Sequence, residues 1–447
     1  MTTLRAAREA STAPDRAAGA APTPRPPEAG PLPSVAASAE EKGWRRTFGS
    51  LVYPQFRLFW LSNLIAAMGL MVQTVAQRWL VVELTDSATL LGLVTAVWAV
   101  AFAVSSVPMG LLADRINRRN LLLCGTITAL LMALAVGALV AADLISVWHL
   151  FLAGIIGGIL YALRVPAGQT MTARLVPQKH LMNAISLNQT AHSLPSIAGP
   201  AAGGVLVAAI GIAGAYFITT GAFLAGLLMM LGVAASFGSI ERSAPKSAAL
   251  DLKEAYAYLL EHRELLYLTA AMLTPFILGQ SYVLLLPLFV EKELHLGPEA
   301  FGALSACVGA GSVLGALLVA TFGRERQLGM LMFAGVVATG LAGIVYGFSG
   351  NVFLTGATLF AAGAGESALF AAYDTVLLIR LPDAIRGRVM GLMFTLVAMF
   401  PVGAIVAGAA ADVVGLRAVA IAEGIIILPI AVIAWLGVLR KVTGRTV

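Results

Sequence analysis

The sequence predicts an all-α membrane protein whose twelve transmembrane helices form two six-helix pseudo-repeats. Hydrophobic residues make up 59% of the 447 residues and charged residues only 12%, about half the charged share of a typical soluble domain. Such a chain has too little polar surface to cover a water-soluble globule. Long apolar runs recur along it, and in lipid each run must form a helix, because the backbone has to satisfy its own hydrogen bonds. This composition excludes cytosolic enzymes, secreted disulfide scaffolds and disordered chains.

Twelve runs are long and apolar enough to span a bilayer, which takes roughly 20 residues per helix. Most connections between the runs are short, so successive helices are expected to be antiparallel neighbours. In chain order, the predicted spans are residues 57–83, 88–112, 119–141, 147–171, 183–209, 213–237, 265–290, 299–322, 328–349, 352–378, 388–411 and 416–439.

The segments outside the spans complete the predicted organisation. The N-terminal stretch is rich in Ala, Pro and Arg and has no apolar core, so we expect a disordered tail rather than a signal peptide. The central linker contains DLKEAYAYLLEHR, which is expected to form an amphipathic helix along the membrane surface. The predicted parts are a cytoplasmic tail (1–50), an N-terminal six-helix half (51–237), a cytoplasmic linker (238–264), a C-terminal six-helix half (265–440) and a cytoplasmic tail (441–447).

Lysine and arginine are distributed unevenly over the predicted connections. Most of the chain's 29 lie before the first span or in connections on that same side of the membrane. The opposite side holds only Lys292 and Arg417, and Arg78 and Arg164 fall within spans. Because basic residues are retained on the cytoplasmic side, we expect a multi-pass protein of the cell membrane with both termini in the cytoplasm. The net charge of +6 then belongs to the inner membrane face, and no nucleic-acid partner is expected.

The two halves resemble each other at matching places. ARLVP (173–177) follows the fourth predicted span and IRLP (379–382) follows the tenth, while GPAAGG (199–204) in the fifth span matches PVGAIVAG (401–408) in the eleventh. Two such halves place a central cavity between them and can rock against each other. This arrangement favours a carrier over a channel or a membrane enzyme.

The connection between the second and third predicted spans reads GLLADRINRR. It resembles the G-x-L-A-D-R-x-G-R-R signature of the major facilitator superfamily, with Asn117 at a glycine position; Asn also tolerates the left-handed backbone of a tight turn. Asp114 can pair with Arg118 and face a helix N-terminus across the two halves, and the resemblance implies a cytoplasmic gate. The alternative is a simple positive-inside anchor. The candidate gate residues are Gly110, Asp114, Arg115, Arg118 and Arg119.

Three further stretches resemble a particular branch of that superfamily, the enterobactin-exporter-like permeases and transmembrane secretion effectors. They are MVQTVAQRWLVVELTDSATLLGLV from Met71, LVPQKHLMNAISLNQ from Leu175 and IRGRVMGL from Ile385. Many members of the branch accompany siderophore, antibiotic or drug efflux. This chain departs from the branch at Ser196, where an Arg commonly precedes the Gly-Pro of the fifth helix.

The fifth predicted span also resembles the antiporter motif G-x-x-x-G-P-x-x-G-G of exporters, with Pro195 in place of the first glycine. Glycine lets a neighbouring backbone come close, and proline removes a hydrogen bond and permits a kink. Ordinary small-residue packing is the alternative, but together with the branch resemblance the motif favours export. Its candidate residues are Gly199, Pro200, Gly203 and Gly204.

Ionisable groups within spans are costly and indicate function. Glu366 lies well inside the tenth span and is the main candidate for a carboxylate that binds a coupling proton in the cavity. Asp374 lies nearer the cytoplasmic end on a similar face, and Arg164, in the fourth span, is a candidate partner for either acid. A structural hydrogen bond made by a neutral acid is the alternative for Glu366.

Other polar groups in the spans are weaker candidates. Arg78, Glu83 and Glu423 lie toward the outer ends of their helices, where they either form an extracellular gate or extend to the interface. Four amide side chains could either bind a substrate or form hydrogen bonds between helices: Asn63, Gln73, Gln77 and Asn188. His192 could either bind a proton near neutral pH or simply pack within the bundle.

The sequence therefore predicts a carrier that works by alternating access, and specifically proton-coupled efflux of a small amphipathic compound such as a drug, antibiotic or siderophore. The expected partners are that substrate, protons and the lipid bilayer. No cofactor, metal site or catalytic arrangement is expected, and without a Walker loop ATP is not the energy source. An uptake symporter and a non-transporting membrane scaffold or secretion accessory are the alternatives. Export is favoured because few charged groups lie midway along the spans, which predicts an apolar cavity.

Overall fold

The computed structural model describes residues 49–113, 116–234, 236, 248–279, 281–397 and 400–439. Two of the predicted gate residues, Asp114 and Arg115, lie outside the described residues, as do the C-terminal tail and nearly all of the predicted N-terminal tail. The described chain begins with a short helix, η2 (Gly49–Val52). There the backbone N–H and the hydroxyl of Ser50 donate to Asn183 Oδ1, at 2.9 and 2.6 Å.

The N-terminal half consists of helices α2 to α6. Their bounds are α2 (Pro54–Thr85), α3 (Ala88–Ala113), α4 (Arg118–Ala141), α5 (Val147–Arg174), the one-turn η3 (Gln178–His180) and α6 (Leu181–Leu231). The 51-residue α6 contains two of the predicted spans, which meet at Gly211. This residue has φ 72° and ψ 175°, a backbone conformation open to glycine because it has no Cβ, so the chain reverses there without a loop.

The C-terminal half runs from α8 to η5, after the linker helix α7 (Ala248–Glu261). The described parts of the predicted seventh span lie in α8, α9 and α10, with a break in the helix at Leu285, and those of the eleventh span lie in α14 and α15. The bounds are α8 (Arg263–Gly279), α9 (Ser281–Leu284), α10 (Leu286–Lys292), α11 (Pro298–Phe322), α12 (Glu325–Phe348), α13 (Val352–Arg380), α14 (Asp383–Val397), α15 (Phe400–Val414), α16 (Leu416–Ala434) and η5 (Trp435–Leu439).

The described residues contain no strand, and ten helical segments are long and apolar enough to cross a membrane. One of the ten contains the two spans of α6, and the shorter apolar helix Gly403–Val414 belongs to the eleventh span. The prediction of an all-α fold with twelve transmembrane helices is therefore confirmed.

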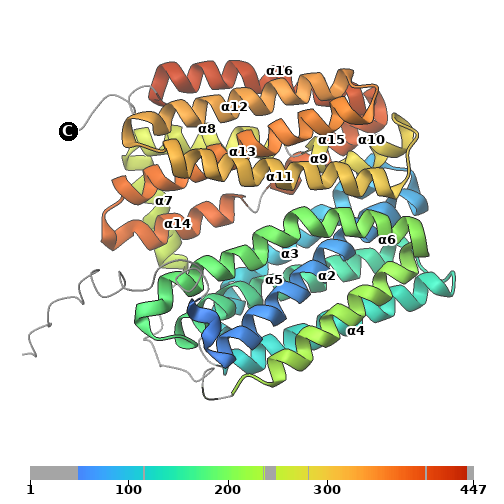
Figure 1. Cartoon of the computed structure of the whole chain (residues 1–447). Helices are drawn as coiled ribbons and strands as arrows, with labels where there is room; N and C mark the ends of the chain where they lie inside the picture. Colours follow the sequence, from blue (N-terminus) through green and yellow to red (C-terminus); the bar gives the residue numbers. More distant parts are fainter. Residues whose placement is uncertain are drawn as a thin grey trace, which may run out of the picture. The chain divides into compact units, whose positions relative to one another are not determined.

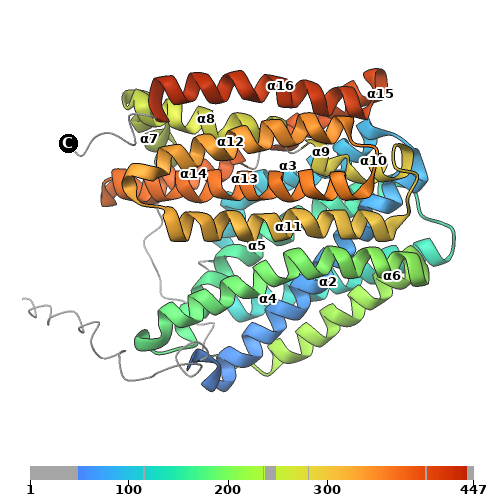
Figure 2. The ribbon, with the colours of Figure 1, turned by 45° about the horizontal axis from the view of Figure 1, so that its top comes forward.

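Each half packs mainly within itself, and in the described part of the chain two helix pairs make most of the contacts between the halves. Figures 1 and 2 show α2, α4 and α6 grouped together, and α11, α12, α13 and α16 grouped together. Between the halves, α3 packs against α15, and α6 packs against α11. These two pairs position the site described below.

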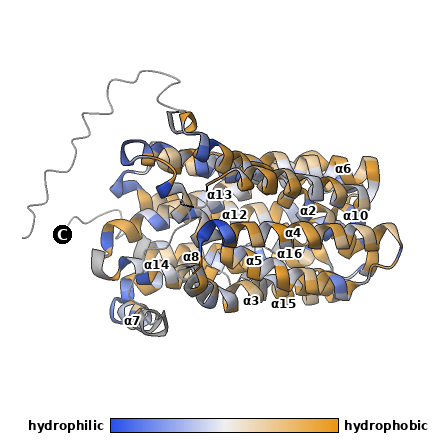
Figure 3. Cartoon of the chain, turned by 90° about the horizontal axis from the view of Figure 1, so that it is seen from below, coloured by the Kyte–Doolittle hydropathy of each residue, from blue (hydrophilic) through white to orange (hydrophobic). Residues whose placement is uncertain are grey.

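Hydrophilic residues gather at one end of the helix bundle. Figure 3 shows this end beside α7 and α14, whereas most of the helical surface is hydrophobic. The described helix ends there carry Arg118, Arg174, Arg324, Arg380 and Arg388, so we call it the basic end. We call the other end, with the α2–α3 turn and Gly415, the far end.

The predicted amphipathic helix of the linker is present as α7, which packs against α14 at the basic end. Ala255 and Leu259 are its buried apolar residues. Arg388 of α14 donates to Glu254 of α7, which fixes the linker to the C-terminal half.

Candidate functional site

Helices α2 to α6 enclose a cavity of about 400 Å³ in the N-terminal half. This volume lies within the range of roughly 300–1,000 Å³ that is typical of small-molecule sites. Most of the side chains around it are apolar, including Leu70, Val94, Met132 and Phe223. The sequence predicted a cavity between the two halves, whereas the described lining of this one comes from the N-terminal half alone. The cavity therefore suits a ligand with substantial apolar surface.

Two arginines of the cavity wall, Arg78 of α2 and Arg164 of α5, depart from this apolar character. Both are half-buried. No Asp or Glu is among the described residues that line the cavity. In the described part of the chain no ion pair or hydrogen bond is found for either guanidinium group. The cavity thus concentrates positive charge within a hydrophobic surrounding.

Uncharged polar groups lie beside the arginines. Gln73 is 4% exposed, and its Oε1 has no hydrogen-bond partner although it is buried at the cavity wall. Gln77 lies one turn further along α2. The hydroxyl of Thr74, by contrast, donates to the carbonyl oxygen of Leu70 at 2.8 Å. The two glutamines are therefore the uncharged groups of α2 best placed to bind a ligand.

An aromatic cluster forms another part of the wall. The ring centroids of Trp98 and Tyr161 are 5.5 Å apart, and Phe102 packs against both at 5.9 and 5.3 Å. Trp98 reaches α5 because Gly157 leaves room for it: a Cβ there would lie 3.2 Å from Trp98 Cδ1. Since Trp98 and Tyr161 also line the cavity, a planar ligand can stack against this cluster.

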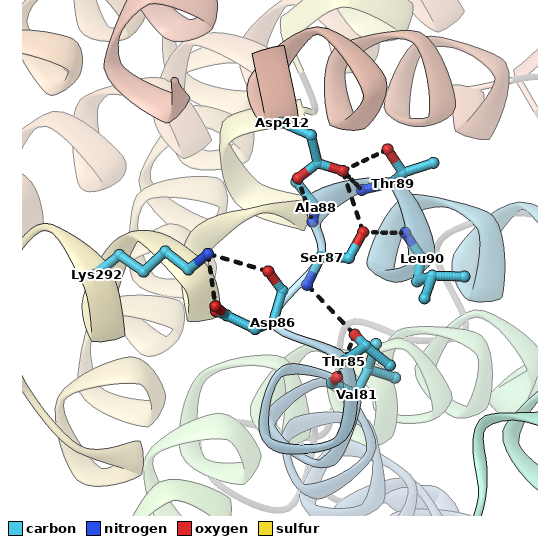
Figure 4. A network of polar contacts seen from close by, with 9 residues as sticks. All are labelled: Val81, Thr85, Asp86, Ser87, Ala88, Thr89, Leu90, Lys292 and Asp412. Atoms are coloured by element: carbon cyan, nitrogen blue, oxygen red, sulfur yellow. Dashed lines mark hydrogen bonds and ion pairs between the residues drawn. The ribbon is translucent and has the colours of Figure 1, made fainter. Parts of the chain in front are cut away.

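At the far end, Asp412 of α15 joins the halves by capping the first turn of α3 (Figure 4). Its carboxylate accepts hydrogen bonds from the backbone N–H groups of Ala88 and Thr89, at 2.9 and 3.0 Å. It also accepts from the hydroxyls of Thr89 and Ser87, at 2.5 and 3.1 Å. A carboxylate at a helix N-terminus satisfies unpaired N–H groups and interacts favourably with the helix dipole.

A second polar contact between the halves lies beside this cap. Lys292, at the end of α10, forms an ion pair with Asp86 in the α2–α3 turn, with Nζ 2.8 Å from Oδ1. The same Nζ donates to the carbonyl oxygen of Asp86 at 3.0 Å. We call the contacts of Asp412 and Lys292 with the α2–α3 turn the far-end clasp.

Close backbone contacts between α3 and α15 continue from the clasp toward the middle of the helices. A Cβ on Gly92 of α3 would lie 2.7 Å from the carbonyl oxygen of Ala404, and one on Gly408 of α15 would lie 2.5 Å from that of Ala88. Trp79 of α2 stacks on Phe301 of α11, with ring centroids 6.2 Å apart. Side chains and backbones of the two halves are thus in direct contact toward the far end.

The glycine and proline motif of the fifth predicted span lies in α6, where α6 meets α2 and α11. Gly199 and Gly203 face α2, where Cβ atoms would meet Met71 and Val75. Gly204 faces α11 in the other half, where a Cβ would overlap the carbonyl oxygen of Pro298, and Pro200 is buried. The motif glycines therefore serve helix packing, both within the N-terminal half and between the halves.

The described residues of the predicted gate lie at the basic end. Gly110 is near the end of α3, with open space where a Cβ would be, and Arg118 begins α4. Arg119 donates to the carbonyl oxygen of Leu231 at 2.8 Å. Asn117 has φ −53°, so its backbone is not in the left-handed conformation that the comparison with glycine assumed. Instead its side chain caps α4 by accepting hydrogen bonds from the N–H groups of Arg119 and Asn120.

The candidate acidic residues do not line the cavity. Glu366 and Asp374 are half-buried on α13 of the C-terminal half, so the described cavity wall includes Arg164 but neither of its candidate partners.

Glu83 is exposed and accepts a hydrogen bond from Trp79 on its own helix. Glu423 is 8% exposed and, with Tyr282 and others, lines a small void of about 10 Å³.

Sequence reasoning missed the residues of the clasp and the aromatic cluster. Lys292 carries a usable signal, because it is one of two basic residues predicted on the far side. Asp412 directly follows the predicted eleventh span, at a point where a carboxylate can cap a neighbouring helix. Trp98 gives no signal, since an aromatic residue within a span is equally compatible with lipid.

Comparisons with known proteins agree with this architecture. A family model described as transmembrane secretion effector matches residues 46–445. The multidrug efflux pump Tap of Mycolicibacterium fortuitum is 25% identical over 393 residues, covering 84% of this chain and 94% of its own. An enterobactin exporter of Citrobacter koseri is 28% identical over 344 residues, covering 76% of this chain and 81% of its own.

A solved structure of a bacterial homologue of the human lysosomal transporter Spinster is similar in fold, with a TM-score of 0.70 and 15% identity. The match covers 90% of this chain and 98% of that one. With its twelve spans, its two joined halves and a family match over nearly the whole sequence, the chain belongs to the transmembrane secretion effector family of major facilitator transporters.

Proposed function

We propose that this transporter exports a small amphipathic compound by alternating access, and that the inward movement of protons drives export. The observation that carries the proposal is the cavity among α2 to α6, which is large enough for a small molecule and lies next to the closely packed far end. The names of the efflux pump and exporter relatives support outward transport.

The far-end clasp is proposed as the extracellular gate. The orientation predicted from the basic residues places the far end outside the cell. In that orientation the clasp closes the cavity to the exterior, and its charge-assisted hydrogen bonds have to break when the halves rock. The motif around Asp114 is proposed to perform the corresponding task at the basic end.

Glu366 is proposed as the coupling carboxylate. It is half-buried within α13, the counterpart of α5 in the other half, and an acid in such surroundings can exchange its proton as access alternates. Asp374, on the same helix, is the second candidate, and Glu423 is the third because it is almost wholly buried.

Uptake by a proton symporter and a scaffold without transport are the alternatives. A scaffold has no use for a cavity containing two arginines. An uptake symporter makes the opposite prediction for direction, since a proton gradient would then drive accumulation of the substrate rather than its expulsion.

The test is a flux assay in proteoliposomes with an imposed pH gradient and a panel of amphipathic compounds. The wild type should move at least one compound against the direction of proton movement. Glu366→Gln mimics the neutral acid, so it should lose proton-driven flux yet keep exchange of substrate for substrate, whereas Asp374→Asn should keep both. Flux in the same direction as protons would establish uptake, and equal proton movement in wild type and Glu366→Gln would place the proton site elsewhere.

A further inference from the structure

The cavity contains two guanidinium groups whose charge is not balanced by its described walls. Arg78 and Arg164 come from different helices, and both line the one hydrophobic cavity without an acidic residue among the described lining. A guanidinium group that is partly withdrawn from water into apolar surroundings is stabilised by a partner of opposite charge.

We infer that the cavity binds an amphipathic organic anion, whose anionic group lies at Arg78 and Arg164 and whose aromatic part lies against Trp98 and Tyr161. The inference rests on the proposed function, because it names the class of substrate for the same cavity. Guanidinium groups form paired hydrogen bonds with carboxylates, sulfonates and phosphates, so these are the expected anionic groups.

The other groups of the wall fit such a ligand. The unpartnered Oε1 of Gln73 is a buried acceptor at the cavity, and it matches a hydroxyl or amide N–H of the substrate. The cluster of Trp98, Phe102 and Tyr161 provides aromatic faces at centroid distances of 5.3–5.9 Å from one another. A cationic amphiphile finds no carboxylate among the described cavity residues and meets two like charges instead.

The test uses three naphthalene probes of similar size and different charge: naphthalene-2-sulfonate, 2-naphthalenemethanol and 2-naphthylmethylammonium. Binding to the purified full chain in phosphatidylcholine nanodiscs is measured by calorimetry. The sulfonate should bind about tenfold or more tightly than the alcohol, the scale of one charge-assisted contact, and the ammonium should bind most weakly. Equal or tighter binding of the alcohol or the ammonium would overturn the inference.

Variants locate the anionic group. Arg78→Gln and Arg164→Gln should each weaken sulfonate binding by about tenfold while leaving the alcohol within about twofold, because only the anion uses the charge. Arg78→Lys and Arg164→Lys keep the charge and should recover part of the affinity, which also controls for misfolding. The matched control is Arg326→Gln at an exposed arginine of α12, which should bind the sulfonate as the wild type does. Unchanged sulfonate binding in both Gln variants would overturn the assignment.

Two further arms separate the sources of failure. Replacing part of the phosphatidylcholine with phosphatidylglycerol tests a lipid headgroup as occupant: a steep loss of sulfonate affinity would overturn the assignment to a diffusible substrate, and unchanged affinity supports it.

In the flux assay, proton-driven export confined to neutral or cationic compounds would overturn this inference and leave the proposed function in place. Sulfonate binding without any proton-driven flux would support the anion site and overturn the proposed coupling.

Discussion

Asp412 shows how one side chain can link two halves of a carrier. A helix usually obtains its N-terminal cap from a residue just before it, but the first turn of α3 is capped from α15, more than 300 residues away in sequence. The cap forms only when the halves are together at the far end. The carboxylate therefore stabilises one conformation of the carrier as well as the helix that it caps.

The prediction at this scale is that Asp412→Asn shifts the carrier away from far-end closure. The neutral amide loses the charge of an exposed helix cap, a contribution of about 1 kcal/mol, which corresponds to roughly a fivefold change in the population of the closed state. The measurement is the distribution of distances between spin labels at Asp143 and Val413, in a background without Cys124 and Cys307.

Glu293→Gln is the matched control, because Glu293 is a carboxylate toward the far end whose ion pair with Arg417 stays within the C-terminal half. Its label distances should match those of the starting protein. A distribution for Asp412→Asn that equals the control would mean that the clasp does not bias the equilibrium between conformations.

At the scale of helices, α6 contacts both its own half and the opposite one through small residues. Gly204 and Gly302 meet backbone to backbone, so a methyl group on either residue forces the halves apart. Gly221 of the same helix has open space where a Cβ would lie. These two glycines of α6 provide a matched pair for testing what close packing does.

We predict that Gly204→Ala disfavours far-end closure and reduces transport, whereas Gly221→Ala leaves both unchanged. Alanine has the higher helix propensity, by about 1 kcal/mol, so each substitution stabilises the helix locally and only Gly204→Ala introduces a clash. The label distances used for Asp412 and the flux assay report the two effects. Equal behaviour of the two variants would show that the α6–α11 contact tolerates an added methyl group.

The apolar runs of the sequence were sufficient to predict every transmembrane helix, because a bilayer requires long apolar helices and permits little else. They did not predict the break in the seventh span at Leu285, since an interrupted helix and a continuous one can have the same composition. Nor did they place Arg78: its helix extends to Thr85, which leaves the arginine about 10 Å from the helix end. A span that is apolar on all sides does not indicate which face meets the cavity and which meets lipid.

For the whole molecule, the separation of charge between the two ends predicts its orientation in the membrane. A reporter fused after Val447 or inserted at Lys246 should lie in the cytoplasm, and one inserted at Asp143, an exposed turn of the far end, should lie outside. Protease protection of the reporters in intact cells distinguishes the two locations. An external reporter at Val447 would reverse the assignment of the two gates.

The two arginines of the cavity also bear on how the carrier is powered. An anion that leaves a cell with a negative interior moves down the membrane voltage, which contributes about 2.3 kcal/mol per charge for each 100 mV. That energy alone supports roughly a fiftyfold concentration ratio of a monovalent anion. A cation exported through the same cavity would move against the voltage.

We therefore expect a potassium diffusion potential, imposed with valinomycin in the absence of a pH gradient, to drive naphthalene-2-sulfonate out of the negative compartment. One-for-one exchange with an incoming proton would carry two charges per cycle, so the voltage would act on both ions. Flux that is insensitive to this potential would contradict electrogenic transport. Because Arg78 and Arg164 would select an anionic substrate, the voltage across the membrane would act directly on that substrate as a driving force.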